Sequence, residues 1–164
     1  MKIIIAVVFY FLYWGMCFLG TGTDRKNLLG LRSYPEEVQS RVRSDPQLAK
    51  DGLKEKSTVS ILLSNLLLFT VVFSVLGLAL KNVLSLNSYM PAFWYFLALG
   101  EGLGLFDLLV IDLLWWRNTK RIRFSCLPEK KYYQDPKKHI ASFLRGIPLF
   151  AVAAALTALV VTLL

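Results

Sequence analysis

The sequence has few of the residues from which metal and disulfide sites are built. Its 164 residues include a single histidine, His139, and two cysteines, Cys17 and Cys126. We expect these two cysteines not to pair with each other, and neither has metal-ligand spacing. The zinc-binding HExxH, the redox CxxC, the hydrolase GxSxG and the phosphate-binding glycine loop are all missing. We therefore expect no catalytic residue, no metal and no cofactor.

Charged residues are also scarce. They make up 18% of the chain, against 55% hydrophobic residues, whereas soluble domains contain about 25% charged and about 45–50% apolar residues. The abundance of large apolar side chains excludes an intrinsically disordered chain. It also argues against a water-soluble domain.

Four apolar runs account for this composition. A helix needs roughly 20 apolar residues to cross about 30 Å of hydrocarbon, and the predicted spans cover residues 3–20, 58–80, 91–116 and 141–164. We predict an all-α integral membrane protein, a single membrane domain over residues 1–164 with a bundle of about four transmembrane helices.

The first run also resembles a secretory signal peptide. It is longer than the usual apolar core and no Ala-x-Ala site follows it, so we expect it to be retained.

The basic residues are concentrated in two predicted loops, residues 21–57 and 117–140, with eight in each loop. They are Arg25, Lys26, Arg32, Arg41, Arg43, Lys50, Lys54 and Lys56 in the first, and Arg117, Lys120, Arg121, Arg123, Lys130, Lys131, Lys137 and Lys138 in the second. Because cytoplasmic loops are enriched in Lys and Arg, we predict both loops in the cytoplasm and both termini outside, in the plasma or inner membrane. The net charge of +8 then reflects orientation, and we expect no nucleic-acid partner.

The first loop is expected to contain short helices. Ser33, Pro35 and Glu36 are typical of a helix start, with Ser33 as the cap. Val38 and Val42 are four residues apart and should share one face of that helix. The loop either covers the ends of the spans or docks a partner protein.

The second loop begins with a basic cluster beside two tryptophans. Its members are Trp115, Trp116, Arg117, Lys120, Arg121 and Arg123. Aromatic residues followed by cations are typical of a membrane interface, where each cation contributes about 1 kcal/mol on anionic lipid. We predict that this cluster binds the anionic headgroups of the bilayer.

Three acids, Glu101, Asp107 and Asp112, lie inside the third predicted span. A charge in hydrocarbon costs at least about 2.5 kcal/mol, so such residues pair, face water or carry a function. From the depths of residues in neighbouring spans, we predict an ion pair between Asp112 and Arg145 and a contact between Asp107 and Asn65. Glu101, Asp107 and Asn65 then form a predicted proton or ligand site. On an α-helix, Asp107 should point away from the face that Glu101 and Asp112 share.

Small residues predict a close contact between the third and fourth spans. Gly100 and Gly104 in the third span, with Ala151 and Ala155 in the fourth, have the spacing that lets helices approach closely.

We favour a non-enzymatic accessory or interaction component of a membrane complex, with a membrane-protein partner or a second copy. The alternative is a small secondary transporter or ion pathway that uses the intramembrane acids. A lipid-modifying membrane enzyme is the least favoured hypothesis.

Overall fold

The computed structural model of this protein describes residues 1–49 and 57–164. Within those residues every named element is a helix, and the one β contact is an isolated bridge between Phe124 and Leu127. The all-α prediction is therefore confirmed. The chain divides into two compact units: unit 1 is Met1–Phe9, Lys56–Leu105 and Phe143–Leu164, and unit 2 is Tyr10–Glu55 and Phe106–Ser142. Three lysines of the first predicted loop (50, 54 and 56) lie outside the described residues.

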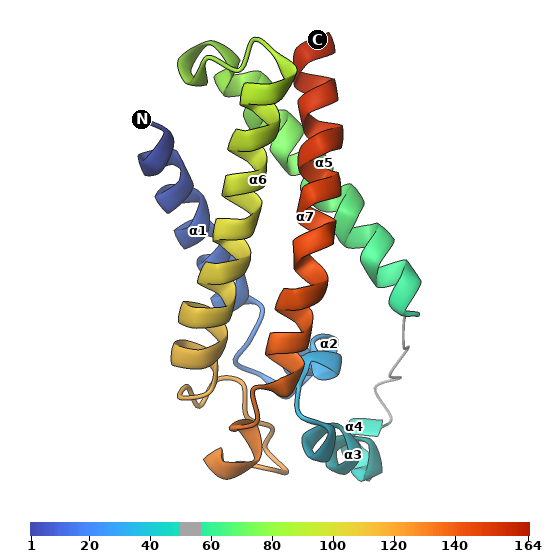
Figure 1. Cartoon of the computed structure of the whole chain (residues 1–164). Coiled ribbons are helices and arrows are strands. Elements are labelled where there is room, and N and C mark those ends of the chain that lie inside the picture. Colours follow the sequence, from blue (N-terminus) through green and yellow to red (C-terminus); the bar gives the residue numbers. More distant parts are fainter. Residues whose placement is uncertain (50–56) are drawn as a thin grey trace. The chain divides into compact units, whose positions relative to one another are not determined.

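Four long helical stretches lie where the spans were predicted (Figure 1). The first two are α1, Lys2–Leu19, and α5, Thr58–Leu84. The third is α6, Tyr89–Phe106, which continues as a π-helix, η2, over Asp107–Trp116. The last is α7, Lys137–Leu163, which begins before the predicted residue 141 and contains Pro148 in its interior.

Three helical stretches of the described chain are long and apolar enough to cross a membrane: Lys2–Leu19, Thr58–Leu84 and Lys130–Leu163. These stretches make a membrane bundle plausible, with three candidate spans where we predicted about four. The third predicted span is not among them. Its α-helical part, α6, carries the acid Glu101. The rest of the span is a π-helix, which carries two further acids, Asp107 and Asp112.

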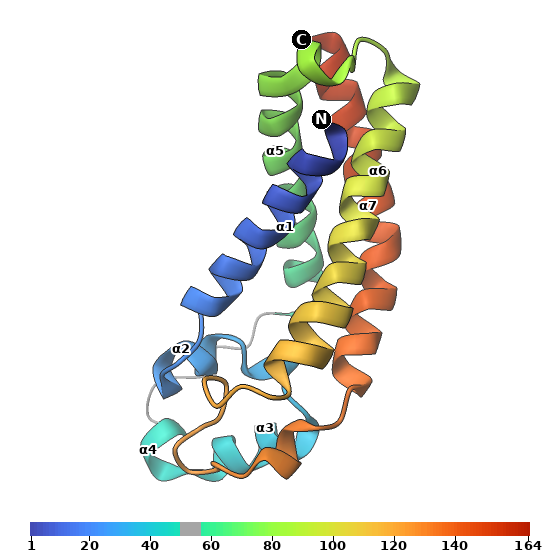
Figure 2. The ribbon, with the colours of Figure 1, turned by 90° about the vertical axis from the view of Figure 1, so that its left-hand side faces the viewer.

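In unit 1 the helices α5, α6 and α7 lie side by side (Figure 2). Stacked aromatic rings fill the space between them. Phe73 of α5 lies 5.6 Å from Phe96 of α6 and 6.4 Å from Phe150 of α7, measured between ring centroids. At Gly77 a Cβ would lie only 2.5 Å from a methyl group of Val161. The missing side chain therefore lets α5 approach α7 closely.

Local hydrogen bonds set the ends of α5. At its start, the Ser57 hydroxyl accepts a hydrogen bond from the backbone N–H of Ser60, at 3.1 Å, as expected of an N-cap. At its end, Ser85 adopts a left-handed conformation with φ 56°. The N–H of Leu86 donates to the carbonyl of Lys81 at 2.9 Å. These contacts end the helix and allow α6 to begin after a short turn.

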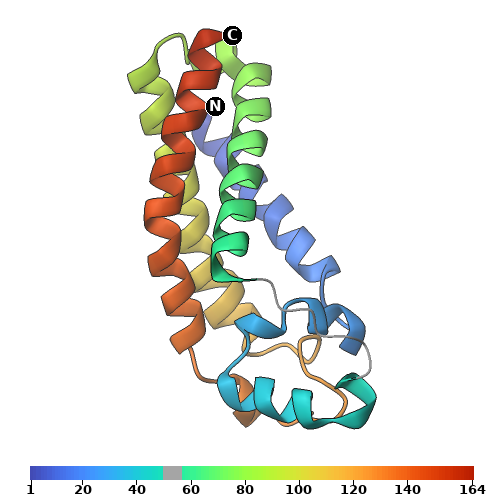
Figure 3. The ribbon, with the colours of Figure 1, turned by 90° about the vertical axis from the view of Figure 1, so that its right-hand side faces the viewer.

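Unit 2 contains the described parts of the two predicted loops, which lie side by side (Figure 3). The two loops share one hydrophobic core. The first loop contributes the helices α2 (Asp24–Leu29), η1 (Leu31–Ser33), α3 (Glu36–Ser44) and α4 (Pro46–Ala49), and the second contributes η3 (Lys130–Tyr133). We call the buried cluster the loop core; it consists of Leu31, Tyr34, Val38, Val42, Leu48, Trp116, Ile122, Phe124, Leu127 and Tyr133.

The predicted helix of the first loop is present, with a different start. Ser33 ends the 3₁₀ turn η1, and α3 begins at Glu36 after Pro35, which offers no side-chain cap. The expectation that Ser33 caps the helix was wrong, because Ser33 belongs to η1 and two residues, Tyr34 and Pro35, separate it from the start of α3. Val38 and Val42 are both fully buried on one face of α3, as predicted.

Backbone and side-chain hydrogen bonds connect the two loops within unit 2. The Tyr34 hydroxyl donates to the carbonyl of Ile122 at 2.9 Å, and the Asn27 amide donates to the carbonyl of Arg121 at 3.0 Å. Asp24 accepts from both the backbone N–H and the hydroxyl of Ser125. Buried carbonyl groups of the second loop thus find donors on the first, as buried polar groups must.

Candidate functional site

Asp107 and Asp112 lie on a π-helix and not on the α-helix expected for the third predicted span. From Asp107 onward the chain is a π-helix, in which residue i+5 hydrogen-bonds to residue i. The N–H of Arg117 accordingly donates to the carbonyl of Asp112, five residues earlier. In this geometry Asp112 follows Asp107 by one turn, and the two carboxylates interact electrostatically. The expectation that Asp107 points away from Asp112 assumed an α-helix, whereas this stretch is a π-helix.

Asp112 is paired with the single histidine of the chain. The imidazole Nδ1 of His139 lies 2.9 Å from the Asp112 carboxylate. His139, in the first turn of α7, is 4% exposed, and its ring centroid lies 4.7 Å from that of Trp116 at a steep angle. The imidazole of His139 therefore contacts both a carboxylate and an indole within unit 2.

Two side chains of α1 complete this cluster. Tyr13 and Cys17 are half-buried, hydrogen-bond to each other, and interact electrostatically with both Asp107 and Asp112. Neighbouring rings of α1 and of the third stretch stack, with Tyr10 lying 5.5 Å from Phe106. We call Tyr13, Cys17, Asp107, Asp112 and His139 the acid–histidine cluster.

The other predicted site residues belong to unit 1. Glu101 is half-buried on α6, and Asn65 is exposed on α5. The contacts predicted between Asp107 and Asn65, and between Asp112 and Arg145, would join the two units and stay predictions.

The predicted small-residue contact lies within unit 1. A Cβ at Gly100 would lie 2.8 Å from the Phe150 ring, and one at Gly104 would lie 3.3 Å from it. Both glycines therefore face α7 at Phe150. Ala151 and Ala155 are only half-buried, whereas their neighbours Ala153, Ala154 and Ala158 are fully buried.

Several residues of the predicted lipid anchor make protein contacts in unit 2. Arg121 donates to the carbonyls of Phe18 and Thr21 at 3.2 and 2.9 Å, and its guanidinium lies 3.9 Å from the Phe18 ring centroid. It thus binds the C-terminal end of α1, where a cation is favourable. Gly22, with φ 109°, leaves the space that Arg121 fills.

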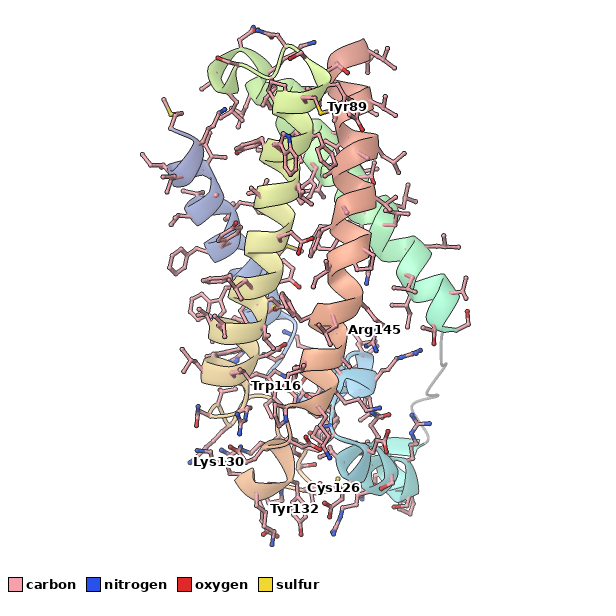
Figure 4. All side chains as sticks on the ribbon, in the orientation of Figure 1. Tyr89, Trp116, Cys126, Lys130, Tyr132 and Arg145 are labelled. Carbon is pink, nitrogen blue, oxygen red and sulfur yellow. The ribbon has the colours of Figure 1, made fainter. Side chains whose placement is uncertain are left out.

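The remaining members of the anchor differ in exposure. Arg123 donates to the carbonyl of Pro128, at 3.2 Å, while Lys120 is exposed. Trp116, which ends η2 (Figure 4), is 7% exposed and belongs to the loop core. Of the two tryptophans it is therefore Trp115, half-buried against Trp14, that stays nearer the surface.

The chemistry open to the acid–histidine cluster is proton exchange. Its groups include two carboxylates and one imidazole, the side chain that most readily changes charge near neutral pH. No group of three or more potential metal ligands occurs among residues 1–49 and 57–164.

Sequence reasoning named His139 only in the least favoured hypothesis, a lipid-modifying enzyme that uses it with the acids, and did not expect its contact with Asp112. The fourth span was expected from residue 141, which placed His139 in the loop before it. Because α7 begins at Lys137, its first turn presents His139 to η2. The available signal was that the only histidine lies next to a span whose neighbour carries three acids.

No protein-family model, curated protein or solved structure matches this chain.

Proposed function

We propose that this chain crosses the membrane four times, with both basic loops in the cytoplasm. The shared loop core supports this arrangement, because two loops that pack together must lie on the same side. The chain leaves that core before α5, a candidate span, and returns to it at Trp116. The stretch of α6 and η2 must then cross back, although its acids lower its hydropathy.

Cysteine labelling tests this topology. In a Cys126→Ala background, Ser88→Cys places a thiol in the exposed turn before α6, which we expect to face outward. An impermeant maleimide should label Ser88→Cys on intact cells, while Cys126 of the wild type should react only after permeabilisation. Labelling of Cys126 on intact cells would reverse the orientation.

We further propose that the protein is a non-enzymatic component of a membrane complex, which binds a membrane-protein partner through unit 2. The observation that carries this proposal is that the two loops form a packed unit with its own core, and not separate flexible connections. Between α3 and η3 this unit has a groove of about 300 Å³. Acids and lysines line the groove: Glu36, Glu37, Asp135, Lys131, Lys137 and Lys138. Because the groove carries charges of both signs, it is suited to bind a polar surface of another protein.

Affinity purification in mild detergent tests the interaction. We expect a membrane protein to co-purify with the tagged wild type and to be lost from a groove variant, Glu37→Lys with Lys131→Glu. A control variant, Arg25→Glu with Lys26→Glu on α2, changes exposed charge outside the groove and should retain the partner. Two differently tagged copies in one cell detect a homo-oligomer. Retention of the partner by the groove variant would contradict this docking surface.

A second function, passage of protons or cations through the membrane, is favoured by the acids themselves. Glu101 is half-buried on α6, and Asp107 interacts with Asp112 in unit 2. Acids within spans are functional candidates by default. In reconstituted vesicles, Glu101→Gln and Asp107→Asn should each abolish a proton or cation flux that the wild type supports. Absence of flux in the wild type would remove this second candidate.

A further inference from the structure

Only one of the two ring nitrogens of His139 has a hydrogen-bond partner among the described residues. Nδ1 faces the Asp112 carboxylate at 2.9 Å, and a carboxylate accepts hydrogen bonds only. Nδ1 therefore carries the proton of the neutral ring. The other nitrogen, Nε2, is left as an acceptor with a free electron pair.

Nε2 is buried and has no hydrogen-bond partner among the described residues. His139 as a whole is 4% exposed. A buried polar atom without a partner is rare and calls for an explanation. Here the explanation is a nitrogen that is free to accept a proton, while the rest of the ring is held by Asp112 and Trp116.

A second carboxylate increases the attraction for a proton. Asp107 lies one π-turn from Asp112, and the two interact electrostatically. Two neighbouring carboxylates disfavour each other's charge, so one additional proton stabilises the pair. Trp116 packs against the imidazole, with the two ring centroids 4.7 Å apart in a T-shaped arrangement.

We propose that Asp107, Asp112 and His139 form a single proton-binding site. A proton enters at Nε2 of His139 and converts the imidazole to imidazolium, whose Nδ1–H still donates to Asp112. If the Nδ1 proton then moves to the Asp112 carboxylate, the ring is neutral again with its proton on Nε2. The added proton is thus shared between the imidazole and the carboxylates, and no other reactant is needed. The site deepens the second proposal above, since proton passage requires such a site, whereas the site requires no passage.

Most other titratable and charged groups of unit 2 near this site make contacts of their own, while the buried Nε of Arg117 has no partner among the described residues. The phenols of Tyr34 and Tyr133 donate to backbone carbonyls of Ile122 and Leu127. Lys138, beside His139 in sequence, pairs with Glu36 at 3.0 Å. On α1, Tyr13 and Cys17 hydrogen-bond to each other. The two aspartates and the imidazole are thus the members of this surface that are left to exchange a proton.

Nuclear magnetic resonance of the single histidine tests the proposal. Protein with isotope-labelled histidine, in lipid nanodiscs, gives one imidazole signal set, which is followed from pH 5 to 9. We expect the wild-type ring to carry its proton on Nδ1 when neutral and to gain a second proton on Nε2 as the pH is lowered. Asp112→Asn should lower its proton affinity about tenfold or more, and Asp107→Asn about threefold, because each removes a negative charge.

Controls separate this result from a general loss of structure. Glu129→Gln removes an exposed acid of the same unit, paired with Lys131, and should leave the titration unchanged. Asp112→Glu keeps a carboxylate and should restore the affinity to within about threefold. If Asp112→Asn does not fold, Asp107→Asn decides alone. A wild-type ring that does not titrate, or an Asp107→Asn protein that titrates like the wild type, overturns the proposal. Because no flux is measured, failure of the second function above leaves this result unaffected.

Discussion

Nδ1 of His139 and the carboxylate of Asp112 lie 2.9 Å apart and connect the first turn of α7 to the π-helix η2. Both side chains are largely removed from solvent, with exposed fractions of 4% and 15%. Such a contact holds two elements together only if both partners are present, because either one alone leaves a buried polar group without its partner.

The first prediction concerns the energy of this contact. Asp112→Ala and His139→Ala should each destabilise the protein, and the double variant should lose less than the sum of the two. We expect a coupling energy of about 1–3 kcal/mol, as for residues in one hydrogen-bonded pair. Unfolding in detergent, followed by circular dichroism, measures it. Additive losses would show that the contact contributes no stability.

The second prediction is the ion pair between Asp112 and Arg145. The same thermodynamic cycle, with Arg145→Gln as the second change, should give a coupling of at least about 0.5 kcal/mol. A smaller value would leave His139 as the energetically relevant partner of Asp112. For comparison, the loss of stability caused by His139→Ala is also measured in a protein that carries Arg145→Gln.

The third prediction concerns the loop core. Tyr34→Phe removes the hydroxyl that donates to the carbonyl of Ile122, and the buried carbonyl loses its donor. The free energy of unfolding should fall by about 1–3 kcal/mol. Tyr132→Phe is the matched control, since that ring lies at the surface of unit 2 beneath Arg41. Its effect should stay within about 0.5 kcal/mol.

The fourth prediction concerns the close approach of α6 and α7. Gly100→Ala would place a Cβ 2.8–3.0 Å from three atoms of Phe150, so the ring must move. We expect a loss of about 1–3 kcal/mol from this overpacking, and partial recovery when Phe150→Leu is added. Gly15→Ala meets nothing within 4 Å. It should be neutral or stabilising, because alanine favours the helix.

The fifth prediction is the pH dependence of thiol labelling at Cys126. Partial burial raises the pKa of this thiol, and the charges of Asp45 and Asp24 raise it further. The thiolate is the reactive form, so alkylation at pH 7 should be slower than for an unperturbed cysteine and should increase steeply above pH 9. Asp45→Asn should lower the pH at which the rate reaches half its maximum. An unchanged profile would contradict the influence of Asp45.

Much of the fold follows from local patterns in the sequence. The predicted span of residues 58–80 lies within α5, and the span of residues 3–20 nearly coincides with α1. Hydrophobic runs of this length leave a helix as the one structure that satisfies its own backbone in an apolar medium. The face shared by Val38 and Val42 was readable for the same reason, since helical spacing is local.

The candidate site could be predicted only in part. Asp107 and Asp112 were identified because a charge in an apolar run is conspicuous. The π-helix on which they lie was not predicted, because the residue pattern gives no sign of it. The contact of His139 with Asp112 was not predicted because α7 begins at Lys137, four residues before the predicted span, where the backbone N–H of Lys137 donates to the Asp135 carboxylate at 3.0 Å.

By itself the sequence determined the helical class, the positions of the long apolar helices and the concentration of basic residues in two loops. Hydrophobicity and charge act residue by residue, so they can be read without coordinates. Only the tertiary structure decided that the two loops share one core, that Trp116 lies inside it, and that Asp112 is paired with His139. Each of these joins residues far apart in the chain, and such contacts depend on packing that no local pattern records.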